Sequence, residues 1–320
     1  MNYKQFFEKI DFMSKESGRS KISILVDVVI SGFKYSSGYM DYYLFRFHKL
    51  PHEKRITYLT RGKNNEIVKM LNSAEESKKF ASKSAFNESF QEYIGREWIN
   101  FAKCSKEEFI KWIESKDCVF IKPQVGCGGS GVKKVKIKEK DLDSLYENFR
   151  SNNIGIIETC LAQHPLMSKL YQDSINTLRI ATVVDDFNNV DVIYTFVRIG
   201  NGGDVDNFNS GGMSAKIDSV TGEIITEAID KDSNTFGTHP ITGVNILGYT
   251  IPLWDEAIDL VKKAALVVPK VRYVGWDVAI TPNGPVLVEG NEYPGNDLTQ
   301  MSIFIDNQEG ILPLFDKYIN

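Results

Sequence analysis

A predicted β-hairpin near the C-terminus constrains the fold more than any other feature of this sequence. The runs 276–280 and 286–289 are apolar and rich in β-branched residues, and they flank the turn sequence Pro-Asn-Gly-Pro at 282–285. Each run also contains one carboxylate, Asp277 in the first and Glu289 in the second. Acidic side chains in a hairpin are usually just solvated, but these two alternate with aliphatic neighbours. We therefore expect a chemical role for them.

The expected strand pairing brings the two carboxylates to one face of the hairpin. If the loop is centred on Asn283, Asp277 and Glu289 lie opposite each other, with Cβ atoms roughly 4.5–5.5 Å apart. Carboxylates at that separation repel each other unless a cation lies between them. Asn291 follows Glu289 by two residues and points to the same face if the strand continues. Two carboxylates and an amide oxygen form a hard-oxygen site that suits Mg²⁺, which keeps its other positions for water and phosphate oxygens.

A second strand pair, with a glycine-rich connection, is predicted over residues 118–138. Gly126, Gly128 and Gly131 fit the pattern G-x-G-x-x-G, but a strand follows them where a dinucleotide-binding fingerprint needs a helix. No Walker motif is present, because neither Lys-Ser nor Lys-Thr follows the last glycine. We expect a flap whose backbone N–H groups approach phosphates, with Lys122 reaching a nucleotide phosphate. A simple hairpin loop is the alternative.

A protein kinase shares a glycine-rich hairpin of this kind. It also needs its phosphate-binding lysine on the strand after the glycines, and the tripeptides H-R-D and D-F-G further along the chain. Neither tripeptide occurs in this sequence. The glycine pattern therefore does not indicate a protein kinase.

Two arginines lie inside apolar strand segments in the middle of the chain. Arg179 belongs to the predicted strand 178–184 and Arg198 borders the predicted strand 190–197. Each needs an anionic partner, because burying an unpaired charge costs roughly several kcal/mol. The partner is either a structural Asp or Glu or a bound phosphate, which a guanidinium also suits. The glycine-rich segment 200–212 then predicts a mobile or ligand-facing loop.

The remaining segments are predicted to be mostly helical. Residues 1 to about 75 carry seven aromatic side chains between positions 33 and 47, which either pack a small helical lobe or form a wall for an acceptor or a partner. Residues 73–101 also show a helical pattern. The clearest amphipathic helix is 252–268, and we expect it to cover the sheet that contains the hairpin.

Composition excludes several classes of protein. The chain has 320 residues, 25% charged residues and a formal net charge of -4, so it can form two or three lobes and shows no basic, aromatic platform for nucleic acid. No apolar run is long enough for a transmembrane segment, and the N-terminus lacks the apolar core of a signal peptide. The four cysteines show no paired spacing, which favours a reducing cytoplasm.

These features together resemble the ATP-grasp superfamily, and within it the sugar-transfer-associated ATP-grasp proteins found with polysaccharide biosynthesis genes. Part of the pattern is also similar to the ribosomal-protein glutamate ligases. The resemblance covers roughly residues 75–300 and depends on the order and spacing of its motifs. They are FIKP at 120–123, the glycine flap at 126–131, Glu158, SINTLR at 174–179, Arg198, Asn207, Gly-Gly at 211–212, Gly-Trp-Asp at 275–277 and Glu-Gly-Asn at 289–291.

The resemblance implies an α+β fold in which two α+β subdomains clamp ATP, preceded by an N-terminal, mainly helical lobe. We predict this lobe at residues 1–75 and a helical lead-in at 76–115. The small subdomain with the glycine flap would occupy residues 116–161. The large subdomain with the magnesium site would occupy residues 162–320.

The resemblance also implies roles for individual residues. The ATP phosphates would be contacted by Lys122, by an earlier lysine, for which we select Lys83, and by the flap residues Gly126, Gly128, Gly129, Ser130 and Gly131. Adenine would be held, largely through backbone groups, by the hinge residues Glu158, Thr159, Cys160 and Leu161, with His164 beside the ribose. Mg²⁺ would be bound by Asp277, Glu289 and Asn291. The transferring phosphate and the acyl intermediate would be steadied by Arg179, Arg198 and Asn207.

The activity implied by this family is ATP-dependent ligation of a carboxylate to an amine through an acylphosphate, in the synthesis of a capsule, O-antigen or exopolysaccharide. The expected partners are a small carboxylate, a small amine and a sugar or nucleotide sugar. Whether the chain forms a homo-oligomer is left open by the sequence. Two alternatives remain. One is a kinase of a sugar or alcohol acceptor, and the other is a nucleotide-binding assembly protein without turnover.

Overall fold

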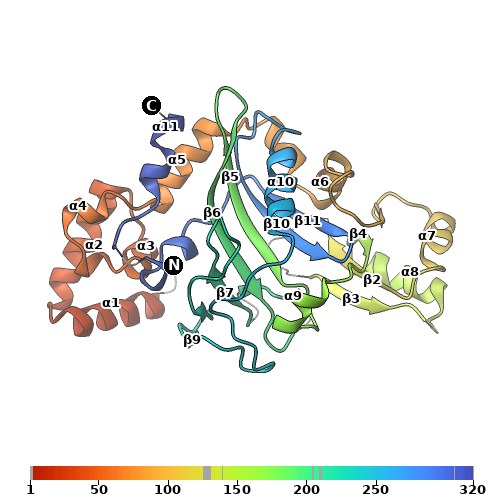
Figure 1. Ribbon diagram of the computed structural model, residues 1–320, viewed down its shortest axis with the longest axis horizontal. Coiled ribbons are helices and arrows are strands. Elements are labelled where there is room, and N and C mark those ends of the chain that lie inside the picture. The colour runs from red at the N-terminus through yellow and green to blue at the C-terminus, as the bar shows by residue number, and fades with distance from the viewer. Residues whose placement is uncertain are drawn as a thin grey trace. The chain divides into compact units, whose positions relative to one another are not determined.

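The computed structural model describes residues 3–124, 131–138, 140–203, 205–208, 211–305 and 307–319. The chain forms two compact units (Figure 1). The first joins Met1–Ser73 to the C-terminal segment Tyr293–Asn320, and the second is Ala74–Glu292. The sequence had grouped residues 293–320 with the large subdomain, whereas here they pack with the N-terminal helices. The finer division within residues 76–292 stays a prediction.

The first unit is helical, as predicted for the N-terminal lobe. Ser20 and Thr60 cap two of its helices, because each side-chain oxygen accepts a backbone N–H of the first turn. Its elements are α1 (Tyr3–Ser17), α2 (Lys21–Tyr35), α3 (Tyr39–Leu44), η1 (Phe47–Lys49), α4 (His52–Arg55), α5 (Arg61–Leu71), η4 (Leu298–Gln300), η5 (Ser302–Phe304), η6 (Leu312–Phe315) and α11 (Asp316–Ile319).

Buried aromatic and amide side chains hold this unit together. Of the predicted aromatic cluster, four members are buried, whereas Phe33 is 90% exposed; the buried ones are Tyr35, Tyr42, Phe45 and Phe47. Figure 1 shows the C-terminal helix α11 beside α5. Gln300 is fully buried, and its amide accepts from Leu59 N at 2.8 Å and donates to Leu59 O at 2.9 Å. The C-terminal segment is therefore part of this unit's core.

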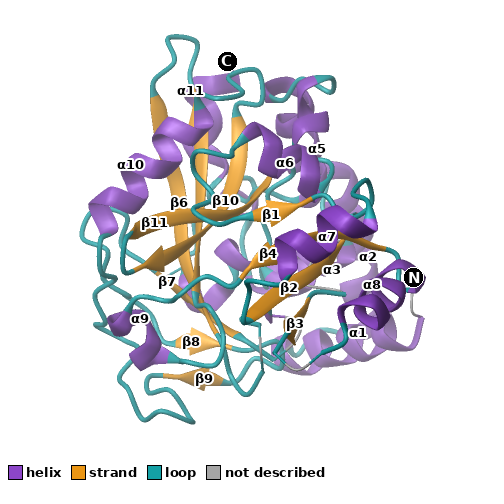
Figure 2. Ribbon diagram, turned by 90° about the vertical axis from the view of Figure 1, so that its right-hand side faces the viewer, coloured by secondary structure: helices purple, strands orange, loops and turns teal. Residues whose placement is uncertain are grey.

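The second unit contains two antiparallel sheets. The smaller one has the strand order β1-β4-β2-β3. Figure 2 shows α7 and α8 next to it, and Phe109 of α7 and Phe149 of α8 share one buried core with Phe101, which precedes α7. Its elements are β1 (Trp98–Ile99), α7 (Lys106–Ile113), β2 (Cys118–Pro123), β3 (Lys133–Lys136), α8 (Leu142–Ser151) and β4 (Ile154–Thr159).

The larger sheet has the order β11-β10-β5-β6-β7-β8-β9, which makes β11 an edge strand. The helix α10 packs on β11, β10 and β5, which confirms the prediction that it covers the hairpin sheet (Figure 1). The elements are η2 (Glu76–Lys79), α6 (Lys83–Ser89), α9 (Pro165–Leu170), β5 (Thr177–Val184), β6 (Val190–Ile199), β7 (Met213–Lys216), β8 (Ala228–Ile229), β9 (Thr235–Phe236), α10 (Trp254–Ala265), β10 (Tyr273–Thr281) and β11 (Gly284–Asn291).

These elements confirm the predicted α+β class and most of the predicted segments. The exception is the helical expectation over 73–101, which is wrong beyond α6. At Gly95 the backbone takes a positive φ of 56°, and a Cβ there would lie 2.3 Å from Cγ1 of Val286. After α6 ends at Ser89, the backbone at Gly95 packs against β11. Within the described part of the chain, no helix is both long and apolar enough to cross a bilayer.

Candidate functional site

Asp277 and Glu289 face each other across β10 and β11, as predicted. The strand register that produces this pairing was not evident from the sequence pattern. The loop is only residues 282–283, so the pairing runs from Thr281 opposite Gly284 to Val278 opposite Leu287. A β-bulge at that point leaves Val288 without a partner and restores Glu289 to the Asp277 position.

The bulge decides on which face Glu289 lies. In an unbroken register Asp277 would pair with Val288, and Glu289 would pair with Trp276 on the opposite face. That face is the core, where Trp276 is fully buried against Phe90 at a ring separation of 5.4 Å. One extra residue therefore moves a carboxylate out of the core and places it beside Asp277.

Asp277 lies between two arginines. Its carboxylate is 6% exposed and contacts Arg179 (Nε to Oδ1, 2.6 Å; Nη2 to Oδ2, 3.2 Å) and Arg198 (Nη1 to Oδ2, 2.9 Å). Burial opposes ionisation of Asp277, but the two guanidinium groups hold its pKa below the ordinary range. The anionic partner of Arg179 and Arg198 in this structure is therefore a carboxylate of the protein itself, which was one of the two predicted possibilities. Arg179 and Arg198 are two cations that share one carboxylate, and the acidic residues Glu289 and Asp206 also interact with this cluster.

Glu289 lacks such compensation. It is partly buried, and among the described residues it has no hydrogen bond and no ion pair. Burial raises its pKa, and the charge of Asp277 raises it further, against weaker opposition from Lys83 and Lys122. Asn291 donates Nδ2 to the Gly275 carbonyl at 3.5 Å, so its amide oxygen stays an acceptor.

The carboxylate of Glu289 and the amide oxygen of Asn291 fit a hard cation, whereas both oxygens of Asp277 already accept hydrogen bonds from Arg179 and Arg198. The described residues contain no group of three His, Cys, Asp or Glu side chains that could hold a metal ion. A metal here would therefore depend on Glu289, Asp277 and the Asn291 amide oxygen, completed by water or phosphate, which is the mixed coordination that Mg²⁺ accepts. The uncompensated carboxylate of Glu289 is the observation that favours it.

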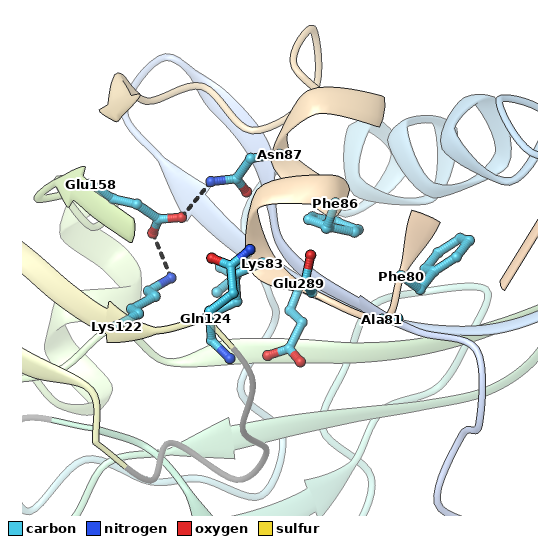
Figure 3. Close-up of a pocket in the computed structure, with 11 residues that line it drawn as sticks. Phe80, Ala81, Lys83, Phe86, Asn87, Lys122, Gln124, Glu158 and Glu289 are labelled. Atoms are coloured by element: carbon cyan, nitrogen blue, oxygen red, sulfur yellow. Dashed lines mark hydrogen bonds and ion pairs between the residues drawn. The ribbon is translucent and has the colours of Figure 1, made fainter. Parts of the chain in front are cut away.

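Next to Glu289 lies a polar pocket that contains both predicted phosphate lysines (Figure 3). Lys83 begins α6, and Lys122 comes from β2. Figure 3 shows the side chains of Lys122 and Asn87 pointing toward Glu158, while Lys83 and Glu289 line the same pocket. The lining residues are Phe80, Ala81, Ser82, Lys83, Phe86, Asn87, Lys122, Gln124, Glu158, Val288 and Glu289.

The carboxylate of Glu158 is the electrostatic centre of this pocket. The residue is 2% exposed, and its side chain contacts Lys122 at 2.5 Å, Arg96 Nε at 2.9 Å and Asn87 Nδ2 at 2.8 Å. Burial alone would raise the pKa of Glu158, but the cations of Lys122 and Arg96 hold it far below its usual range. The side chain of Glu158 therefore holds two cations in place. This role is additional to the backbone contact with adenine that the family resemblance implied.

A second, mainly apolar pocket adjoins the first. It shares Lys122, Glu158 and Val288 with the polar pocket, so the ion pair of Lys122 and Glu158 forms part of both walls. Its other lining residues are Arg96, Phe120, Val132, Thr159, Leu161, Ile175, Thr177, Val205 and Asp206. An apolar slot that opens beside two lysines suits a ligand with a flat ring and an anionic tail.

The structure brings only some of the predicted residues into these pockets. Thr159 and Leu161 line the apolar one, whereas Cys160 is not among the described lining residues. His164 caps α9 by accepting Leu166 N at 3.2 Å and lines neither pocket. The carbonyl of Asn207 accepts Gly212 N at 3.0 Å. Gly126, Gly128, Gly129 and Ser130 lie outside the described residues, and Gly131 has a positive φ of 76°.

Three residues at the site were not anticipated from the sequence: Asn87, Arg96 and Asp206. Asp206 accepts Thr177 N at 2.8 Å and Thr177 Oγ1 at 2.5 Å, and burial raises its pKa. Its position in the glycine-rich segment 200–212 was a signal, because that segment was expected to face a ligand. Arg96 and Asn87 carried no such signal, since each lies among other polar residues of an amphipathic stretch.

Comparison with known proteins gives one family match. The model of a family described as "Sugar-transfer associated ATP-grasp" matches residues 64–318. No curated protein matches the chain.

Similar solved structures include three ligases or synthetases, all at low identity. An L-amino acid ligase from Bacillus licheniformis is 11% identical, with a TM-score of 0.41 over 70% of this chain and 43% of that one. N5-carboxyaminoimidazole synthetase from Staphylococcus aureus, complexed with ADP, is 12% identical, with a TM-score of 0.43 over 68% and 46%. D-alanine–D-alanine ligase from Bacillus anthracis is 12% identical, with a TM-score of 0.45 over 80% and 73%. The chain spans less than half the length of the first two.

Proposed function

Because the chain belongs to the sugar-transfer associated ATP-grasp family, we propose that it is an ATP-dependent ligase that joins a carboxylate to an amine through an acylphosphate. The observation that carries this proposal is the pair of adjoining pockets. One is apolar, and the other contains Lys83, Lys122 and the uncompensated carboxylate of Glu289. This arrangement supports binding of an adenine ring in the first pocket and of phosphates in the second.

Lys83 and Lys122 would bind the phosphate chain. Lys122 is held by Glu158 at 2.5 Å, so a phosphate does not have to order a free lysine side chain. Glu289, Asn291 and Asp277 would hold Mg²⁺, which when bound offsets charge on the phosphoryl oxygens.

Arg179 and Arg198 would act on the transferring group. In the first half-reaction a carboxylate oxygen attacks the γ-phosphorus, the bond to the β-phosphate oxygen breaks, and ADP leaves. In the second half-reaction the amine nitrogen attacks the acyl carbon, phosphate leaves with the bonding electrons, and the nitrogen loses a proton to form the amide. The guanidinium groups of Arg179 and Arg198 would stabilise the phosphoryl oxygens during the first half-reaction, because preorganised cations in a partly buried site cost no reorganisation.

The setting of this reaction is also part of the proposal. The family description associates ATP-grasp proteins with sugar transfer, which supports a role in polysaccharide synthesis with a sugar or nucleotide-sugar substrate. A cytoplasmic location is supported by Cys104, Cys118 and Cys160, which are all free thiols. Release of ADP and phosphate together with an amide distinguishes a ligase from a kinase.

The direct test is a screen for ADP release over paired acids and amines that includes nucleotide-linked uronic acids and amino sugars. We expect ADP and phosphate in equal amounts, together with an amide detected by mass spectrometry, and only when both substrates are present. Phosphate retained on an acceptor would show a kinase instead. Nucleotide binding without turnover in any pair would leave the assembly-protein alternative and contradict the ligase.

A further inference from the structure

Arg96 is buried where the smaller sheet meets the edge strand of the larger one. Its side chain is 2% exposed. A guanidinium has five N–H donors, and the four on Nη1 and Nη2 make hydrogen bonds within the protein. Their acceptors are Glu158 Oε1 (3.0 Å from Nη2), Val288 O (3.1 Å from Nη2), Leu287 O (2.6 Å from Nη1) and Ile94 O (3.1 Å from Nη1). Nε lies 2.9 Å from Glu158 Oε2, which is an ion-pair contact without a hydrogen bond, so Arg96 has five polar contacts in all. The Nη1 and Nη2 donors are all used within the protein and Nε is buried beside Glu158, so we interpret Arg96 as a residue that positions other groups.

Two of these acceptors belong to the β-bulge. In a regular strand successive carbonyls point to opposite edges, but those of Leu287 and Val288 both face Arg96. Because β11 is the edge of its sheet, no strand in the described part of the chain pairs with them there. The N–H of Leu287 is satisfied from the same side, by the carbonyl of Tyr93 at 2.8 Å. The segment around Arg96 therefore takes the place of a neighbouring strand at the position where the bulge occurs.

The residue before Arg96 makes this approach possible. Gly95 has a φ of 56°, and a Cβ on it would lie 2.3 Å from Cγ1 of Val286, closer than atoms can approach. A glycine is thus required for the backbone to come near enough to β11 for the guanidinium to reach two consecutive carbonyls.

We propose that Arg96 is a positioning residue that fixes the β-bulge at Val288, and through it the orientation of Glu289, while it holds the Glu158 carboxylate that pairs with Lys122. One guanidinium thereby links the phosphate lysine on one sheet to the metal carboxylate on the other. The roles of Lys122 and Glu289 rest on the proposed function. The link itself rests on the five contacts of Arg96 and on the register of the hairpin.

The first test compares metal binding with nucleotide binding in Arg96→Lys and Arg96→Gln. Lysine keeps the charge beside Glu158, but its three donors lack the planar fork needed for both carbonyls. With Mn²⁺ as the probe, measured by electron paramagnetic resonance in the presence of ADP, we expect the Kd to rise roughly 10- to 100-fold, as for other residues that support a metal ligand. The Kd of ADP in EDTA should change less than about threefold for Arg96→Lys.

The matched control is Arg150→Lys. Arg150 also donates to backbone carbonyls, those of Ala102 at 3.2 Å and Cys104 at 2.5 Å, but it lies on α8, which packs on the smaller sheet. We expect this variant to lose stability without a change in the Kd of Mn²⁺. An Arg96→Lys variant that binds Mn²⁺ as the parent protein does would overturn the proposal, and so would an equal loss in Arg150→Lys.

A second test removes the bulge. Deleting Val288 joins the pair Val278–Leu287 directly to the pair Asp277–Glu289, so the carboxylates stay opposed in a regular register. In the protein that lacks Val288, Arg96→Lys should change the Kd of Mn²⁺ less than about twofold. Without the bulge, the orientation of Glu289 no longer depends on the contacts of Arg96. An undiminished effect would contradict the proposed route through Val288. If the parent protein binds no Mn²⁺ with ADP, the proposed metal site is wrong. If the parent protein binds Mn²⁺ but the variants do not differ from it as expected, only the proposed role of Arg96 is wrong.

Discussion

Lys122 Nζ lies 2.5 Å from a carboxylate oxygen of Glu158, and the side chains are 12% and 3% exposed. The lysine expected to bind ATP phosphates is therefore already paired with an anion. Such a pair holds the lysine in place, but removal of either partner leaves the other as an unpaired buried charge. This consequence can be measured.

Replacing Glu158 with glutamine should strongly destabilise the protein. The substitution leaves Lys122 and Arg96 as uncompensated buried cations, a change that typically costs about 3–5 kcal/mol. Urea unfolding at pH 7 measures the loss. The control Glu97→Gln removes the exposed partner of Lys116 at 2.7 Å and should cost no more than about 1 kcal/mol. Similar losses in the two variants would show that the Glu158 network is not a buried charge cluster.

The low pKa of Glu158 also predicts a pH dependence. Because its pKa is lower in the folded state than the ordinary value of 4.5, ionised Glu158 contributes stability above that pH, and the contribution is lost as the pH falls toward the folded-state pKa. The difference in unfolding free energy between the parent protein and Glu158→Gln should therefore shrink in acid. A difference that stays constant from pH 7 to pH 3 would contradict the assignment.

Replacing Glu289 with glutamine should stabilise the ligand-free protein while abolishing Mn²⁺ binding and ADP release. The pKa of Glu289 is raised by burial and by Asp277, so the ionised carboxylate destabilises the fold as the pH rises above the ordinary value of 4.5. The gain in unfolding free energy should be present at pH 8 and disappear below about pH 4. Glu147→Gln, at an exposed position on α8, is the control. A Glu289→Gln variant with full turnover would remove the basis for the metal assignment.

Replacing Asp277 with asparagine should destabilise the protein and create an anion site. Arg179 and Arg198 would lose the carboxylate that both contact, at a cost of about 3–5 kcal/mol. Inorganic phosphate should restore part of the loss, so we expect a larger rise in Tm with phosphate for this variant than for the parent protein. Asp186→Asn, which removes an exposed partner of Arg272, should show neither effect. An equal response to phosphate would contradict the expected anion site.

Replacing Gln300 with methionine should destabilise the helical unit. Its buried amide accepts from Leu59 N at 2.8 Å and from Ile311 N at 3.1 Å, and methionine of similar size can do neither. Each buried group left unpaired costs about 1–3 kcal/mol. Hydrogen exchange at the Leu59 amide measures the effect directly. Gln308→Met, at an exposed position, should leave that exchange rate unchanged, and equal protection in Gln300→Met would contradict the role of this contact.

Several features of the molecule could be predicted from the sequence because they depend on local patterns. Alternating apolar residues indicated β2, β5, β6, β10 and β11, and the 3.6-residue period indicated α10. The spacing of Asp277, Glu289 and Asn291 predicted all three on one face, and the structure agrees because the bulge offsets the shorter loop. The order of these segments along the chain was enough to indicate the family. None of these inferences needed to know which distant residue touches which.

The remaining features depend on contacts between residues far apart in the chain. Periodicity gave a loop centred on Asn283, but the hairpin closes on a shorter loop, and Asp277 meets Glu289 only through the bulge at Val288. Arg96 supports that bulge from 191 and 192 positions away. A carboxylate in a sequence likewise does not reveal its partner: Glu158 pairs with Lys122 and Arg96, and Asp277 with Arg179 and Arg198. Local sequence sets the backbone conformation and the face of each side chain, whereas burial and charge pairing exist only once the sheets have packed.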